Sequence, residues 1–216
     1  MANYQNYSIS RGKGKFYLKS ATPQESYEEV TYGEGQKTYH KYSNRINGIL
    51  KYFDTKEAVT KDGKKLQFLE LTFIEGDNNN KVSVPLKNSK GNFTDEVKAI
   101  VSALNNADFG HNMTATLKTS TWEKNGKTGD NFNFYLNYID RKNDEGKGLS
   151  TGFISFVDVP KAIKEEDEDL GTTWDWKPVN KFYAQKIKEI KERFDNSAPA
   201  PQPQTTPVVE EDDLPF

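Results

Sequence analysis

The sequence predicts a mainly β protein whose centre is a five-stranded barrel with one helix between the third and fourth strands. Three observations lead to this fold class. Between residues 45 and 140, short segments rich in branched and aromatic residues recur, several of them alternating with polar residues as half-buried strands do. One segment in the middle of this region has helical spacing. Stretches rich in Gly, Asn and Asp separate the segments, as turns do.

The first three predicted strands follow one another directly. Residues 46–53 are rich in branched and aromatic side chains, and residues 66–74 form the most strongly β-prone segment of the chain. Asp62-Gly63, between them, is a typical hairpin turn. Residues 81–86 then alternate between apolar and polar. We therefore expect three consecutive strands joined by short turns.

A helix is predicted after the third strand. Thr94 is a suitable N-cap residue, and the two acids that follow it favour a first helical turn. The apolar residues then recur at helical spacing: Val97, Ile100, Val101 and Leu104.

Two further strands follow the helix. Residues 113–122 and 132–139 alternate again, and the loop 125–130 joins them as a hairpin. Three strands, a helix and two strands is the element order of the OB-fold. We therefore expect residues 45–140 to form an OB-fold core.

The flanking segments are expected to be an N-terminal extension, a C-terminal helix and an acidic tail. Trp174 and Trp176 are interpreted as anchors of the final helix, which begins where Pro178 could occupy a first helical turn. The Pro-rich composition after the helix predicts a disordered linker. The boundaries are residues 1–44 for a basic arm with at most one or two irregular strands, 45–140 for the core, 141–195 for an extension with a helix near 178–195, 196–209 for the linker and 210–216 for the tip.

Charge is unevenly distributed along the chain. The total of 30 Lys and Arg against 32 Asp and Glu gives a net charge of −2. Residues 1–65, however, hold 12 basic and 7 acidic side chains, which leaves +5, and residues 210–216 hold four acids and no base. A basic segment of this kind favours a nucleic-acid partner, which the net charge of the whole chain would hide.

Several function classes are excluded or disfavoured. Cysteine is absent, so disulfides, thiolate zinc sites and a cysteine nucleophile are excluded. With only two histidines, a His-rich metal centre is not expected. No apolar run approaches the roughly 20 residues that span a bilayer, and the N-terminus lacks a signal-peptide pattern. No motif assigns a catalytic pair, so we expect a cytoplasmic protein that is not an enzyme and uses no cofactor or metal.

Residues 210–216 combine four acids with a short apolar ending. Phe216 is a rigid aromatic anchor with its own α-carboxylate, and Pro215 limits the entropy lost on docking. A tail that only improved solubility would explain the acids but not the apolar ending. The predicted partner-binding tip consists of Asp212, Asp213, Leu214, Pro215 and Phe216.

This tip resembles that of bacterial-type single-stranded DNA-binding proteins, which end in a run of Asp followed by Ile-Pro-Phe; Leu214 replaces the Ile here. The resemblance implies an OB domain that binds single-stranded DNA. It also implies a linker that presents the tip to replication, recombination and repair proteins. Residues 1–44 and 150–195 lie outside the resemblance. They suggest a divergent, phage-encoded member, found in the host cytoplasm or nucleoid, and leave homo-oligomerisation open.

Aromatic and basic residues are interleaved in and around the predicted barrel. Sequence-tolerant binding of single strands requires rings on which bases stack and cations along the phosphate path. Strand alternation places Lys51 with Phe53 and Lys118 with Trp122, and it turns Tyr135 outward. The alternative to base stacking, for each aromatic ring, is that the ring packs in the hydrophobic core. The predicted DNA-binding residues are Tyr39, Lys41, Tyr42, Arg45, Lys51, Phe53, Lys64, Lys65, Lys118, Trp122, Lys127 and Tyr135.

The sequence therefore predicts a protein that binds and protects single-stranded DNA with little sequence specificity and recruits partners through its tip. Residues 196–209 give a root-mean-square reach of about 20 Å, so the tip could also reach the chain's own basic face. Two alternatives remain. One is a recombination mediator or annealing protein, and the more distant one is an intracellular β-domain that binds glycans or peptides.

Overall fold

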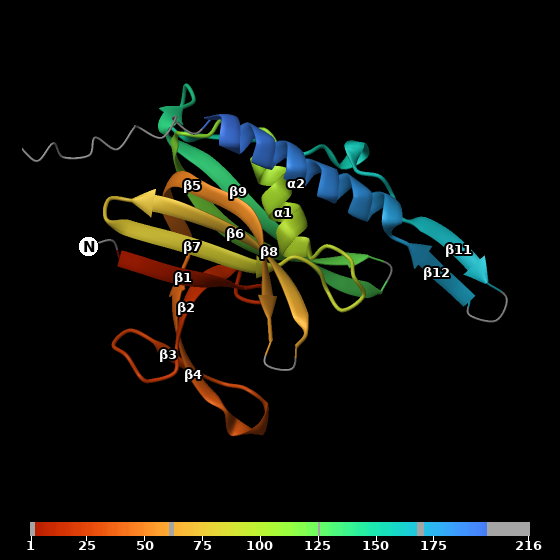
Figure 1. Ribbon diagram of the computed structural model, residues 1–216, viewed down its shortest axis with the longest axis horizontal. Coiled ribbons are helices and arrows are strands. Elements are labelled where there is room, and N and C mark those ends of the chain that lie inside the picture. The colour runs from red at the N-terminus through yellow and green to blue at the C-terminus, as the bar shows by residue number, and fades with distance from the viewer. Residues whose placement is uncertain (1–2, 61–62, 125, 168–170, 198–216) are drawn as a thin grey trace, which may run out of the picture.

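The computed structural model describes residues 3–60, 63–124, 126–167 and 171–197. These residues form a mixed ten-stranded sheet, a separate two-stranded hairpin and two α-helices (Figure 1). The elements are β1 (Asn3–Ser10), β2 (Lys15–Ser20), β3 (Glu28–Thr31), β4 (Lys37–Ser43), β5 (Arg45–Val59), β6 (Lys65–Glu75), β7 (Asn78–Pro85), α1 (Asp95–Leu104), β8 (Asn112–Lys124), β9 (Lys127–Lys142), β10 (Gly148–Ser150), β11 (Ile163–Asp167), β12 (Gly171–Asp175) and α2 (Lys177–Ser197). The predicted mainly β class and the C-terminal helix are confirmed.

The segments predicted as the five central strands are β5 to β9, with α1 between β7 and β8. The first residues of β5 pair antiparallel with β8, and the remainder of β5 pairs antiparallel with β6. Gly48 lies in the stretch paired with β8, just before the ladder with β6 begins, and has a φ of +138°. A Cβ on Gly48 would lie 2.6 Å from the carbonyl oxygen of Ile74, so only glycine fits this close approach.

The four strands β1 to β4, which precede β5, belong to the same sheet. β1 runs parallel to β7, β2 pairs with β1, and β4 lies between β2 and β3. Phe16 of β2 is fully buried, and its ring packs edge-on against Phe134 of β9 at 6.3 Å between centroids. The expectation of an arm with at most two irregular strands is therefore wrong: these residues form four strands, and β1 and β2 contribute to the core.

The sheet is open in its hydrogen-bonded order, which among the described residues runs β10-β9-β8-β5-β6-β7-β1-β2-β4-β3. The expected closed barrel of five strands is not seen in these pairings, because β1 occupies the edge of β7. The turn between β1 and β2 nevertheless approaches β8. A Cβ placed on Gly14, whose φ is +58°, would lie 3.0 Å from Thr119 Oγ1.

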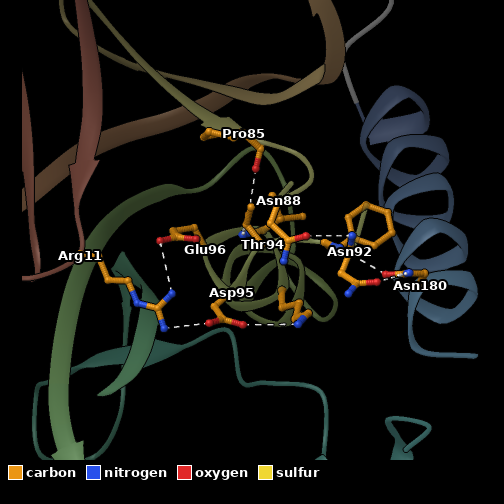
Figure 2. A network of polar contacts seen from close by, with 11 residues as sticks. Arg11, Pro85, Asn88, Asn92, Thr94, Asp95, Glu96 and Asn180 are labelled. Atoms are coloured by element: carbon orange, nitrogen blue, oxygen red, sulfur yellow. Dashed lines mark hydrogen bonds and ion pairs between the residues drawn. The ribbon is translucent and has the colours of Figure 1, made fainter. Parts of the chain in front are cut away.

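The start of α1 is connected to both ends of the chain that the structure describes (Figure 2). Thr94 caps the helix as predicted: its Oγ1 accepts from the Val97 amide at 3.3 Å and donates to the Pro85 carbonyl at 2.8 Å. Arg11, in the β1–β2 turn, binds Asp95 at 2.8 Å. These contacts fix the N-terminal hairpin against the helix.

The helix α2 packs on the same assembly. Its buried residues recur at helical spacing, and Asn180 accepts a hydrogen bond from the Phe93 amide at 3.2 Å. Arg193 donates to the Leu104 carbonyl at 2.9 Å, which satisfies an acceptor at the end of α1. Within the described ranges, neither helix is long and apolar enough to cross a membrane.

Candidate nucleic-acid interface

Three of the predicted DNA-binding residues, Arg45, Lys118 and Tyr135, point to the side of β5, β8 and β9 that faces away from the core. Arg45 pairs with Thr116, and Thr116 pairs with Tyr135, so the side chains of Arg45, Thr116 and Tyr135 form one row across the sheet. Lys118 follows on the same face of β8, with its Nζ 5.4 Å from the centre of the Tyr135 ring. Face parity puts the buried Ile46, Leu117 and Phe134 on the opposite side. The row is therefore a polar and aromatic surface over the core.

Trp122 extends this face toward the β8–β9 hairpin. The β8–β9 ladder has no irregularity between Lys118 and Trp122, so both side chains point the same way. Trp122 pairs with Gly129, where a Cβ would lie 2.6 Å from the indole ring. The ring therefore covers the glycine, and 41% of the residue remains exposed. This is an indole held by the sheet and available to a stacking base.

A second aromatic group lies on β2 and β4, on the side that faces away from Phe16, and includes Tyr32 after β3. We call Tyr17, Tyr32, His40 and Tyr42 the tyrosine–histidine cluster. The rings of Tyr17 and His40 are stacked, with centroids 4.3 Å apart and planes inclined by 18°. Tyr42 lies 5.8 Å from His40 and Tyr32 lies 6.1 Å from it. Period-two spacing, in Tyr17 with Lys19 and His40 with Tyr42, was the signal that could have predicted this group.

Two lysines lie over the tyrosine–histidine cluster. Lys13 Nζ is 3.8 Å from the centre of the Tyr42 ring, and Lys19 Nζ is 5.7 Å from that of Tyr32. Lys13 also binds Glu28 at 2.8 Å, an exposed pair that leaves the ammonium accessible. Cations beside aromatic faces are the combination that single-strand binding uses.

His40 is buried beneath the tyrosines. Its Nδ1 lies 3.3 Å from the Tyr42 hydroxyl, and its Nε2 lies 3.2 Å from Thr38 Oγ1 and 3.3 Å from the Tyr32 hydroxyl. Burial lowers the pKa of His40, and the nearby Lys19 and Lys13 lower it further. The lowered pKa favours the neutral ring, which stacks on Tyr17.

The β1–β2 turn lies near residues of both groups. Lys13 lies over Tyr42, and the next residue, Gly14, abuts Thr119 beside Lys118. β4 also continues into β5 with only Asn44 between them, so Tyr42 and Arg45 are close along the chain. We call these two groups together the outer face: the tyrosine–histidine cluster with Lys13 and Lys19, and Arg45, Lys118, Trp122 and Tyr135 on β5, β8 and β9.

Other predicted residues lie elsewhere. Phe53 is fully buried, so the expectation that it stacks on a base is wrong. The physical reason is a bulge: the β5–β6 register shifts between Leu50 and Tyr52, so Lys51 and Phe53 do not share a face. Tyr39 and Lys41 alternate with His40 and therefore point away from the tyrosine–histidine cluster.

The remaining predicted lysines belong to projecting hairpins. Lys64 and Lys65 are exposed at the end of the β5–β6 hairpin, where Lys65 binds Glu57 at 2.9 Å. Figure 1 shows this hairpin and the β3–β4 hairpin extending from the same side of the sheet. The side chain of Lys127 lies outside the described residues, and so do the tip residues Asp212, Asp213, Leu214, Pro215 and Phe216.

The outer face brings together side chains suited to binding a ligand. In the part of the chain that the structure describes, no group of three His, Cys, Asp or Glu could hold a metal ion. The groups that converge are rings and cations, which provide stacking and charge neutralisation. Comparison with known proteins found no matching family model and no matching curated protein.

Proposed function

We propose that this chain is a non-catalytic protein that binds single-stranded DNA with little sequence specificity, in DNA replication, recombination and repair. The observation that carries the proposal is the outer face, on which Arg45 and Tyr135 lie in one row across the sheet, with Lys118 beside Tyr135 and Trp122 farther along β8. The order β5-β6-β7-α1-β8-β9, with β5 shared between two ladders, supports assigning residues 45–140 to an OB-fold. The tip is proposed to recruit partner proteins.

The outer face fits an unpaired strand better than a duplex. Rings that are held by neighbouring residues offer faces for unstacked bases, and a paired duplex hides those bases within its own stack. Each stacked base contributes about 1–3 kcal/mol, and each neutralised phosphate of a single strand adds about 0.7 to the salt slope. Neither contribution depends on base identity.

The test is a salt titration of binding to oligothymidine and to a duplex of equal length. We expect the single strand to bind more tightly. The double variant Arg45→Ala with Lys118→Ala should lower the slope of log affinity against log salt by about 1.4, because two phosphate contacts are lost. Tyr135→Leu should weaken binding about 5- to 150-fold with little change in that slope, because it removes stacking and no charge.

Matched control variants lie away from the outer face. Lys188→Ala on α2 removes an exposed lysine, and Tyr4→Leu removes a tyrosine that is 72% exposed on β1. Both should bind oligothymidine as the unchanged protein does. Equal affinity for single strand and duplex would contradict the proposal. So would an equal loss of affinity in the control variants.

A further inference from the structure

An apolar groove lies between the N-terminal half of α2, strand β12 and the turn Phe156–Asp158. It encloses about 550 Å³, within the range of about 300–1,000 Å³ typical of ligand sites. Its lining includes Phe156, Val159, Trp174, Trp176 and Tyr183. Phe156 is 83% exposed, and both tryptophans also remain exposed. The prediction that Trp174 and Trp176 anchor the helix therefore accounts for only part of their surface.

The groove has a basic edge. Lys98 and Lys161 line it, and none of the described residues in its lining is acidic. Lys98 Nζ lies 5.3 Å from the centre of the Trp176 ring, so the charge and the aromatic surface are adjacent. A ligand that fits this groove carries negative charge next to an aromatic or branched apolar group.

One segment of the chain has this composition. Residues 210–213 are four consecutive acids, and Leu214, Pro215 and Phe216 follow them. We propose that the groove holds the chain's own tip, residues 210–216, with Phe216 among the tryptophans and the acids toward Lys98 and Lys161. None of the outer-face residues lines the groove, so tip and DNA would occupy separate surfaces.

The distance along the chain allows this contact. α2 runs from the β11–β12 hairpin back across the sheet (Figure 1), and its residues in the groove are Val179 and Tyr183. They precede the end of α2 at Ser197 by about 21–27 Å, at 1.5 Å per residue. The 16 residues 198–213 have a root-mean-square span of about 20–24 Å as a flexible coil. A linker whose reach matches the separation gives the highest effective concentration of the tip at the groove.

The consequence is that the tip stays bound in the groove until a partner protein competes for it. A partner protein would have to displace Phe216 from the groove, so recruitment would depend on the partner's affinity or concentration. This goes beyond the proposed DNA-binding function and does not rest on it. It rests only on the chemistry of the groove and of the tip.

The test uses a synthetic peptide of residues 210–216 and the protein truncated after Val209, both without DNA. Trp122→Phe in all samples leaves Trp174 and Trp176 as the only indole reporters. We expect the peptide to change the tryptophan emission of the truncated protein in a saturable way. A peptide without Phe216 should bind about tenfold or more weakly, because burial of this ring contributes most of the apolar contact. The full-length chain should respond little, because its own tip already occupies the groove.

Two neighbouring residues provide a matched pair of variants. Phe156→Ser removes a ring that lines the groove and should weaken peptide binding about tenfold. Val157→Ser changes a residue that is 86% exposed and does not line the groove, so it should bind the peptide normally. Both are exposed in a turn, so neither variant should unfold the protein.

Four outcomes would overturn the proposal. They are no saturable binding to the truncated protein, equal loss in Phe156→Ser and Val157→Ser, equal binding by the full-length chain, and displacement of the peptide by oligothymidine. The last would place the tip on the outer face. If the full-length protein excluded the peptide more strongly at higher protein concentration, the groove would be occupied by the tip of a second copy of the chain, which would also contradict the proposal. The oligothymidine titration is separate, so each proposal can fail alone.

Discussion

His40 is a buried titratable side chain under Tyr17, Tyr32 and Tyr42, and its environment couples folding to pH. Burial, Lys19 and Lys13 lower its pKa in the folded state, while Glu28 acts in the opposite sense. In the unfolded chain a histidine titrates near its ordinary value of about 6.5. As pH falls below that value, the unfolded state takes up a proton that the folded state resists. His40 therefore stabilises the fold fully above this pH, and the stabilisation is lost as the pH falls.

We predict that His40→Gln makes stability less dependent on pH. The free energy of unfolding of the unchanged protein should decrease between pH 7.5 and pH 5.5, and the variant should show a smaller decrease. Urea unfolding at both pH values measures this difference. A variant with the same pH dependence as the unchanged protein would show that other groups govern it.

At the scale of elements, β5 determines how the sheet is arranged because it belongs to two ladders. It can do so only where the chain bends, and the bend requires the φ of +138° at Gly48 and the contact with Ile74. A second irregularity, the bulge at Lys51, turns Phe53 into the core. Both features are local irregularities of the strand backbone, and they determine which side chains point to the outer face.

We predict that Gly48→Ala destabilises the protein by about 2–3 kcal/mol, since the added Cβ would meet backbone atoms and alanine resists this φ. For a chain of this size the midpoint of thermal unfolding should fall by about 5–10 °C. Gly33→Ala is the control, because nothing lies within 4 Å of its added Cβ. Gly33→Ala should change the midpoint by no more than about 2 °C; equal midpoints in both variants would contradict this account.

At the scale of the whole molecule, the N-terminal strands and α2 are part of one core. Phe16 packs on Phe134, β1 occupies the edge of β7, and Arg11 binds the start of α1. The segment 45–140 therefore lacks a complete set of neighbours when it is alone. The basic N-terminal segment therefore also contributes to the core of the fold.

We predict that residues 45–197 do not fold cooperatively, whereas residues 1–197 do. The shorter fragment would expose the edge of β7 and the site of Phe16 to water, which removes pairing and apolar burial together. Near-UV circular dichroism and thermal unfolding distinguish the two fragments. A sharp transition of 45–197 close to that of 1–197 would show an autonomous barrel instead.

Much of the fold could be predicted because its signals are local. Thr94 caps α1 as expected, and Val97, Ile100, Val101 and Leu104 form its buried stripe. The alternation predicted for residues 113–122 is seen in β8, where Met113, Ala115 and Leu117 are buried, and the helix expected near 178–195 is α2. A periodicity of this kind depends only on residues that are close in sequence, so it can be recognised without knowing the partner strand.

The candidate site was less predictable because it depends on neighbours distant in sequence. Arg45, Lys118 and Tyr135 were each proposed from the sequence, but only the β5–β8 and β8–β9 registers show that they lie close together on one side of the sheet. Phe53 was misplaced because one bulged residue inverts the parity of those that follow. The strands of the first 44 residues were underestimated because their polar composition carries little apolar alternation.

By itself, the sequence determined the mainly β class, the order of the central elements, both helices and the segregation of charge, because propensity, capping and periodicity act within a few residues. The tertiary structure decided that Tyr17 stacks on His40, that β1 takes the edge of β7, and that Trp174 and Trp176 line an exposed groove. These features depend on long-range register and packing, in which the partner of each residue is set by the fold as a whole.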